Sequence, residues 1–157
     1  MGGKAKVSEG KDILLSLYYD GLTAGIYDPV DVGDLGEDFE ARFCEAVLAA
    51  YPDFAEALSY VGNIYTRRGE YAKGLEIDLR LVRLRPRSAR VFYNLACSYA
   101  LLGRPEDAFD ALEKAIERGF SDAEHMARDD DLKSLRDDPR FAALVERARR
   151  STRPAGA

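Results

Sequence analysis

Residues 89–120 place apolar side chains at the period of an α-helix, in two stretches separated by a short break. The apolar positions are Leu95, Ala96, Tyr99 and Leu102 in the first stretch and Ala108, Ala111, Leu112 and Ala115 in the second. Spacings of three, four and seven residues predict two amphipathic helices. Gly103 is suited to end the first helix, because glycine readily adopts the left-handed conformation after a helix C-terminus. Pro105 is suited to begin the second helix, where its missing N–H costs nothing. The pattern therefore predicts a helical hairpin.

The same pattern also occurs earlier in the chain, at a fixed offset. The offset is given by Pro52 and Pro86 (86 − 52 = 34), and residues 55–86 align with residues 89–120 at this repeat period throughout. The matched pairs are Leu58 with Phe92, Val61 with Leu95, Gly62 with Ala96, Tyr65 with Tyr99, Gly69 with Gly103, Gly74 with Ala108, and Leu81 with Ala115. A fixed period of this length indicates repeated hairpins that bury their apolar faces against one another.

Both units resemble tetratricopeptide repeats, which are helix–turn–helix modules of about 34 residues. The residues that carry the resemblance are Leu58, Val61, Gly62, Tyr65, Gly69, Tyr71 and Pro86 in one unit, and Phe92, Leu95, Ala96, Tyr99, Gly103, Ala108 and Ala115 in the next. The units depart from the family pattern at Gly74 and Leu81, where alanine is usual, and at Phe120, where proline is usual. The resemblance implies an all-α fold, a right-handed α-solenoid of about three units with a C-terminal capping helix.

Weaker patterns flank the two units. Residues 11–54 are interpreted as a degenerate repeat with helices in "KDILLSLYYDGLTAG" and "GEDFEARFCEAVLAAYP" and an acidic loop insertion at 26–37. Loops absorb such extra length at modest entropic cost. The predicted organisation is a flexible tail at 1–10, the degenerate repeat at 11–54, repeats at 55–88 and 89–122, a partial repeat with capping helices at 123–150, and a flexible tail at 151–157.

The C-terminal segment carries its own helix signals. Ser121 is expected to be the N-cap of a short helix. Asp138 is expected to cap the last helix, with Pro139 in its first turn. Leu132, Leu135 and Phe141 are expected to dock this segment on the last repeat. It would cover the apolar side that an unfinished stack of repeats leaves exposed.

Residue types that carry catalysis and metal binding are scarce. His125 is the single histidine, which excludes a histidine-rich metal site. We expect His125 to have a surface or capping role, and not to act as a lone acid or base. Cys44 and Cys97 lie in apolar helical stretches, which favours buried, inert thiols. The acids of the insertion are mostly three residues apart and do not fit the alternate spacing of a calcium loop. We therefore predict no catalytic residue, no metal and no cofactor, and a chain that is not an enzyme.

Charge and hydropathy further limit the classes of binding partner and the cellular compartment that we predict. The formal net charge is −5, which argues against nucleic-acid binding. The basic cluster at residues 147–153 suits a helix C-terminus. No apolar run approaches the ~20 residues of a membrane span. The first residues lack the apolar core of a signal peptide. Together with two cysteines interpreted as reduced thiols, these features predict a cytoplasmic protein without a membrane span.

The resemblance also implies a concave surface, lined by the first helix of each unit, where family members bind extended peptides or partner helices. The positions that match this surface are Tyr19, Glu56, Ser59, Tyr60, Asn63, Arg67, Arg90, Tyr93, Asn94, Cys97, Leu101 and Arg128. Tyrosine and asparagine side chains suit such contacts, because they offer apolar area and backbone-like hydrogen bonds. The alternative interpretation is that the tyrosines only pack between helices.

Some members of the family hold the C-terminal carboxylate of a peptide with a Lys/Asn/Asn/Lys/Arg clamp. Asn63, Asn94 and Arg128 match the two asparagines and the arginine, whereas Ser59 and Glu124 replace both lysines. A general peptide groove is therefore the better prediction. The predicted function is a non-enzymatic adaptor or scaffold that binds a peptide or a partner protein. The alternatives are a secretion-type or assembly chaperone and a self-assembling scaffold, which would be a homo-oligomer.

Overall fold

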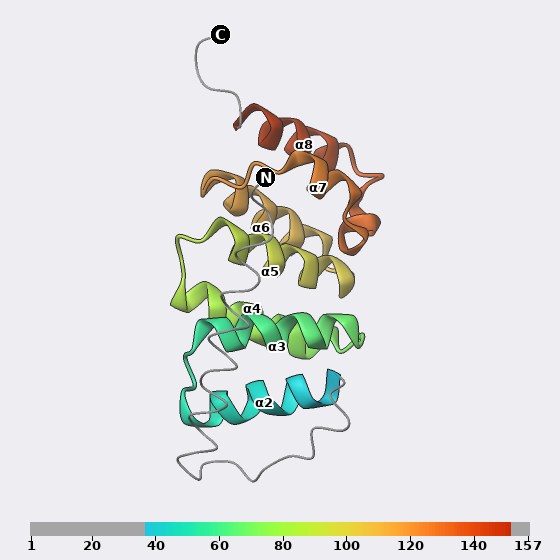
Figure 1. The fold of residues 1–157 in the computed structure, drawn as a ribbon. Helices are drawn as coiled ribbons and strands as arrows, with labels where there is room; N and C mark the ends of the chain where they lie inside the picture. The colour runs from blue at the N-terminus through green and yellow to red at the C-terminus, as the bar shows by residue number, and fades with distance from the viewer. Residues whose placement is uncertain (1–36, 152–157) are drawn as a thin grey trace, which may run out of the picture. The chain divides into compact units, whose positions relative to one another are not determined.

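The structure, a computed structural model, describes residues 37–151 (Figure 1). The predicted N-terminal tail, the first predicted helix and all but the last residue of the acidic insertion lie outside the described residues. So does the predicted C-terminal tail except for Ser151, which is the last residue of α8. The helices are α2 (Glu37–Ala50), α3 (Ala55–Arg67), α4 (Tyr71–Leu84), α5 (Ala89–Leu101), α6 (Pro105–Glu117), α7 (Ala123–Arg128), the 3-10 helix η2 (Asp130–Leu135) and α8 (Pro139–Ser151). No strand occurs between residues 37 and 151, which agrees with the predicted all-α class.

The described residues divide into two compact units, one ending at Ile64 and the other beginning at Tyr65. In the N-terminal unit, α2 buries Ala41, Cys44 and Val47, which share one face of the helix. The turn after α2 is closed by the amide of Phe54, which donates to the carbonyl of Tyr51 at 3.1 Å. Helix α3 then buries Ala57, Leu58, Val61 and Ile64. The buried residues of α2 are three positions apart, which places them on one side of the helix.

The C-terminal unit begins with the turn between α3 and α4, and this turn recurs one repeat later. Gly69 and Gly103 adopt positive φ angles of 73° and 67°. The next amide in each turn reaches back five residues: Glu70 N donates to Tyr65 O at 2.8 Å, and Arg104 N to Tyr99 O at 2.9 Å. Such bonds satisfy the last carbonyls of a helix. Helices α3 and α5, 13 residues each, also begin one repeat period apart. The local geometry thus repeats with the period of the sequence.

The core of the C-terminal unit lies between α5 and α6, with α4 on the other side of α5. Ala96, Ala108, Leu112 and Ala115 are completely inaccessible to solvent. Three of these four side chains are a single methyl group, which permits the two helices to approach closely. The small residues of the repeat are therefore explained by the contact between its two helices.

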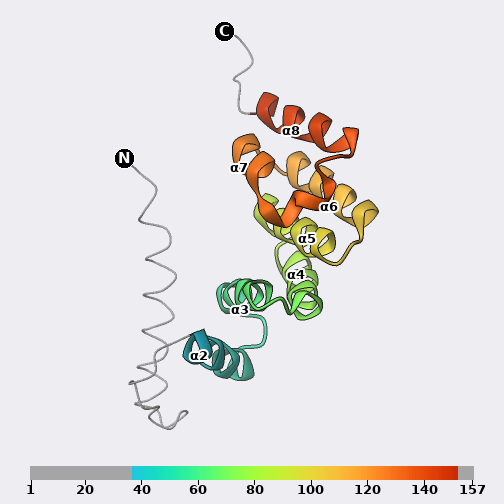
Figure 2. The same ribbon diagram turned by 90° about the vertical axis from the view of Figure 1, so that its right-hand side faces the viewer.

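The C-terminal segment completes this unit, with η2 beside α5 and α8 beside α6 and α7 (Figures 1 and 2). Its buried apolar residues are Met126, Leu132, Leu135, Phe141, Leu144, Val145 and Ala148. Asp138 caps α8 as predicted, because the amide of Arg140 donates to its Oδ1 at 2.9 Å. The N-cap of α7 differs from the prediction: it is Asp122, not Ser121, and it accepts from the amide of His125 at 2.9 Å.

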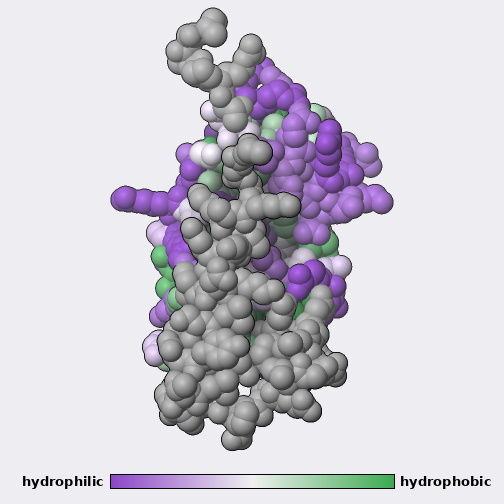
Figure 3. Space-filling view, in the orientation of Figure 1, coloured by the Kyte–Doolittle hydropathy of each residue, from purple (hydrophilic) through white to green (hydrophobic). Residues whose placement is uncertain are grey.

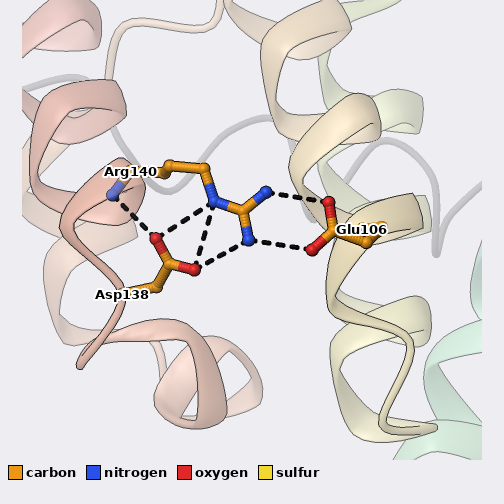
Figure 4. Close-up of polar contacts among 3 residues, drawn as sticks. All are labelled: Glu106, Asp138 and Arg140. Carbon is orange, nitrogen blue, oxygen red and sulfur yellow. Dashed lines mark hydrogen bonds and ion pairs between the residues drawn. The ribbon is translucent and has the colours of Figure 1, made fainter.

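A side-chain ion pair also joins α8 to α6. The guanidinium of Arg140 donates to both carboxylate oxygens of Glu106, at 2.8 and 2.9 Å, and also to Asp138 (Figure 4). The same guanidinium lies 4.1 Å from the ring centroid of Phe109. Arg140 thus fixes the start of α8 against the start of α6, beside the apolar contact between the two helices.

Candidate functional site

Tyr93 lies at the centre of a polar cluster on the face of α5 that is covered by the C-terminal segment. Its hydroxyl donates to Oδ2 of Asp129 at 2.6 Å, and its side chain is 4% exposed. Its ring stacks on Phe120, with centroids 4.2 Å apart and planes 6° apart. Burial and the bond to Asp129 raise the pKa of the hydroxyl, which stays protonated. Tyr93 thus lies on the covered face of α5, and the segment after α7 supplies the carboxylate that accepts its hydrogen bond.

Asp129 has a structural role of its own. It follows the last residue of α7 and caps η2, where its Oδ1 accepts from the amide of Asp131 at 3.1 Å. Its carbonyl accepts from Nη2 of Arg136 at 2.9 Å. Aspartate commonly ends one helix and begins the next through such local bonds. The acidic run at 129–131 therefore breaks the helix here, and the break brings a carboxylate to Tyr93.

Three possible metal ligands meet next to this contact. The sulfur of Cys97 and carboxylate oxygens of Asp129 and Asp131 all lie within 4.8 Å of one another. Nε2 of His125 is 3.4 Å from Oδ2 of Asp129. Burial, and then the charge of Asp129, raises the pKa of the Cys97 thiol, so the neutral thiol is favoured. Metal ligation requires the thiolate. The contacts of Cys97 and Asp129 are explained by packing and capping, and the absence of a metal stays a prediction.

The predicted groove residues fall into different environments. Tyr19 lies outside the described residues. Glu56, Ser59, Tyr60, Asn63 and Arg67 lie along α3, where Asn63 and Arg67 are exposed. On α5, Arg90 is exposed, Asn94 and Leu101 are half-buried, and Tyr93 and Cys97 are buried. Arg128 is exposed on α7 and pairs with Glu124, its Nη2 lying 3.7 Å from the carboxylate. A partner would reach Tyr93 and Cys97 only if α7 and η2 moved away from α5.

The sequence patterns predicted that Leu132 and Leu135 dock the C-terminal segment on the last repeat, but they missed the polar contacts that this segment makes with α5. Asp129 contacts Tyr93, and Oγ of Ser134 donates to the carbonyl of Ala100 at 3.4 Å. The alignment of the repeats does contain one signal of this contact. Asp129 lies one repeat period after Leu95 (129 − 95 = 34), so an aspartate stands where the preceding repeat has a buried leucine. Such a substitution indicates a broken helix, although it does not identify the partner of the carboxylate.

The repeated turns, the equal first helices and the small residues between α5 and α6 define a protein built from helical-hairpin repeats. Residues 53–118 match the family model described as "Tetratricopeptide repeat". Within this segment, the chain therefore matches the repeat module of that family. Repeats of this kind are typically non-catalytic and support protein–protein interaction. Between residues 37 and 151, no helix is both long enough and apolar enough to cross a membrane.

Two curated relatives match part of the chain. The chain is 28% identical over 88 residues to a protein of Arabidopsis thaliana whose name describes it as chloroplastic, and the match covers 54% of this chain and 26% of that protein. It is 41% identical over 51 residues to "Protein CTR9 homolog" of the same organism, and this match covers 32% of this chain and 5% of that protein. The chain therefore spans about a quarter or less of the curated relatives it matches.

Solved structures of similar fold carry the name MamA. "Crystal structure of MamA protein" superimposes with a TM-score of 0.61 and 22% identity, and covers 90% of this chain and 72% of that chain. "MamA MSR-1 C2" gives a TM-score of 0.61 at 15% identity, with 92% of each chain covered. At these identities the likeness shows a shared fold.

Proposed function

We propose that the chain is a protein-interaction module that binds a peptide segment or partner protein along the first helices of its repeats. The observation that carries this proposal is a stripe on α5. Arg90, Asn94, Cys97 and Leu101 are four, three and four residues apart, which places them on one face of the helix. Arg90 is exposed, and Asn94 and Leu101 are half-buried. Three of the four positions thus remain accessible to a partner.

The same stripe exists on α3, one repeat period earlier. Glu56, Tyr60, Asn63 and Arg67 correspond to Arg90, Asn94, Cys97 and Leu101. Asn63 and Arg67 are exposed, and Glu56 and Tyr60 are half-buried. Each of these two helices therefore offers a comparable stripe to a ligand. An asparagine amide both donates and accepts, so it suits the backbone of a bound peptide.

The C-terminal segment limits the surface that is accessible on α5. Tyr93 and Cys97 are buried against α7 and η2, so the proposed contact on α5 depends on Arg90, Asn94 and Leu101. A carboxylate clamp is a weaker form of the proposal, because Ser59 and Glu124 replace its lysines. Self-association stays a prediction, and light scattering over a range of protein concentrations tests it.

A peptide library tests the proposal. Peptides selected on the full chain would be titrated by calorimetry against the wild type and the Asn63→Ala/Asn94→Ala variant. We expect the variant to keep its circular dichroism spectrum and to bind at least about tenfold more weakly, because two amide contacts are lost. Asp110→Ala/Glu113→Ala, on exposed positions of α6, is the matched control. Equal affinity of the wild type and the asparagine variant for every selected peptide would exclude this surface.

A further inference from the structure

The segment around the turn between α4 and α5 is basic without compensating acids. Residues 79–105 contain no aspartate or glutamate, in a chain whose net charge is −5. The segment contains the arginines Arg80, Arg83, Arg85, Arg87, Arg90 and Arg104. Arg83, Arg87 and Arg90 are exposed, and they follow one another from the last turn of α4, through the turn, to the first turn of α5. Positive charge is therefore concentrated at one end of these two helices.

The end of α6 adds a further arginine to this surface. Nε of Arg118 donates to the carbonyl of Pro86 at 2.7 Å, and its Nη1 donates to the carbonyl of Lys114 at 3.2 Å. Its guanidinium also lies 4.1 Å from the ring centroid of Phe92. The turn itself is closed by the amide of Ser88, which donates to the carbonyl of Arg85 at 3.0 Å. We name Arg83, Arg87, Arg90 and Arg118 the turn arginines.

None of the turn arginines has a carboxylate partner among the described residues. The other arginines between residues 104 and 150 all form ion pairs: Arg104 with Asp107, Arg128 with Glu124, Arg136 with Asp130, Arg140 with Glu106 and Asp138, Arg147 with Glu117, and Arg149 and Arg150 with Glu146. The face drawn in Figure 3 is largely hydrophilic over α7 and α8, where several of these pairs lie. Charge is thus neutralised locally there, whereas Arg83, Arg87, Arg90 and Arg118 have no ion pair among the described residues.

We propose that the turn arginines form a docking surface for an acidic segment of a partner protein. Guanidinium groups bind carboxylates with two parallel hydrogen bonds, which gives geometric specificity as well as attraction. Leu84, 36% exposed within the same segment, offers an apolar contact between the charges. The ligand is therefore a polypeptide that combines several aspartates or glutamates with apolar side chains. This inference rests on the proposed function, which makes the partner a protein or peptide, and it adds that the bound segment is acidic.

A polypeptide suits this surface better than a nucleic acid. Duplex DNA carries one negative charge per ~1.7 Å, so its binding requires an extended basic track. Here the basic surface is confined to one turn and one helix end, and α6 itself carries exposed Glu106, Asp110, Glu113 and Glu117. These acids would repel a long polyanion. A short acidic segment meets the arginines without reaching the acids of α6.

Fluorescence anisotropy tests the proposal with a labelled peptide of alternating glutamate and leucine, on the full chain. The variant is Arg83→Gln/Arg87→Gln, which leaves the structural contacts of Arg118 intact. The matched control, Arg147→Gln/Arg150→Gln, removes the same charge from two exposed arginines that are already paired. We expect the turn variant to weaken binding about five- to tenfold and the control less than about twofold. Binding of the wild type should also weaken between about 50 and 200 mM NaCl.

Other outcomes overturn the inference. It fails if the wild type does not bind the glutamate peptide at low salt, if a glutamine-for-glutamate peptide binds equally well, or if both variants weaken binding to the same extent. Tighter binding of a single-stranded oligonucleotide than of the glutamate peptide would assign the surface to nucleic acid instead. If library peptides still bind and depend on Asn63 and Asn94, the proposed function stands although the docking surface fails.

Discussion

The hydroxyl of Ser98 donates to Oδ2 of Asp78 at 2.6 Å, across the buried contact between α4 and α5. Both side chains are buried, at 3% and 6% exposure. One repeat later, their positions are occupied by Leu132 and Leu112, which are fully buried. A hydrogen-bonded polar pair thus replaces two apolar core positions of the repeat. The pair is internally satisfied, but it places an ionisable group in the core.

Burial raises the pKa of Asp78 from 3.8 to about 6, although the bond from Ser98 acts in the opposite direction. The fold therefore favours the neutral acid. Its contribution to stability is fully present below pH 3.8 and is lost as the pH rises through about 6. At about 1.4 kcal/mol per pKa unit, the loss amounts to roughly 2–3 kcal/mol.

Asp78→Asn should remove this dependence, because the amide is neutral at every pH and its oxygen still accepts from Ser98. We expect the variant to be more stable than the wild type at pH 7.5 and to lose most of this advantage at pH 4.5. Urea unfolding followed by circular dichroism at both values measures the difference. Asp110→Asn, at an exposed position of α6, is the control. Identical pH slopes for the wild type and Asp78→Asn would contradict the assignment.

Gly103 ends α5 at a φ angle of 67°, and a Cβ added there would meet nothing within 4 Å. The cost of a side chain at this position is therefore conformational and not steric. Gly103→Ala should lower the free energy of unfolding by about 1–2 kcal/mol. Gly103→Asn should cost less, because asparagine tolerates the left-handed region better.

Thermal or urea unfolding of the two variants ranks these costs. Gly69 is the internal control, because it occupies the same turn one repeat earlier with a φ angle of 73° and an equally open surrounding. At both sites the wild type should therefore be the most stable, the asparagine variant less stable and the alanine variant the least stable. If alanine and asparagine cost equal amounts at both, the backbone conformation does not explain the glycines.

The turn glycines illustrate what the sequence could predict. The repeat period placed Gly69 and Gly103 at equivalent turns, and the structure gives these turns matching bonds and φ angles. The same period predicted repeated hairpins, and the structure gives their first helices 13 residues each. These features are local, since each depends on residues within one turn or one helical face. The periodic pattern therefore carried enough information for the fold of the repeats.

Contacts outside the repeat pattern could not be predicted in this way. The partner of Tyr93 is Asp129, which lies 36 residues further along the chain, so the repeat period does not relate the two residues. Asp78 interrupts an apolar face, but its spacing does not indicate that Ser98 lies opposite. The groove prediction included Tyr93 and Cys97, both of which are buried on α5. It did not foresee that the C-terminal segment covers them.

Tyr93→Phe tests the contact between α5 and the C-terminal segment. The substitution keeps the ring that stacks on Phe120 and removes the hydroxyl that donates to Asp129. Hydrogen bonds to charged groups contribute about 1.5–3 kcal/mol, so we expect a loss of stability near the lower end of this range. Amide hydrogen exchange should also become faster in η2, whose first residues depend on Asp129 as their cap.

Tyr99→Phe is the control for this experiment. Tyr99 is half-buried on α5, and its ring contacts the guanidinium of Arg104 at 4.6 Å. Its substitution should leave both stability and exchange in η2 close to the wild type. Equal exchange in η2 for all three proteins would show that the Tyr93 hydroxyl does not hold the segment.

The ion pair between Glu106 and Arg140 predicts a salt-dependent effect. Hydrogen bonds from Arg140 lower the pKa of Glu106 and that of Asp138. A depressed pKa stabilises the fold above the ordinary pKa of the group, and this contribution is lost as the pH falls through the depressed value. Because the side chains of Glu106 and Arg140 are exposed, the contribution of their ion pair to stability should be small and screened by salt.

Glu106→Gln should therefore lower Tm by about 1–3 °C at pH 7 and low ionic strength. The difference from the wild type should shrink in about 1 M NaCl and disappear in acid, where Glu106 is protonated in both states. Differential scanning calorimetry measures each condition. Glu113→Gln removes the same charge from an exposed position of the same helix and should leave Tm nearly unchanged. A Glu106→Gln effect that persists at high salt would mean that the side chain acts through packing instead of charge.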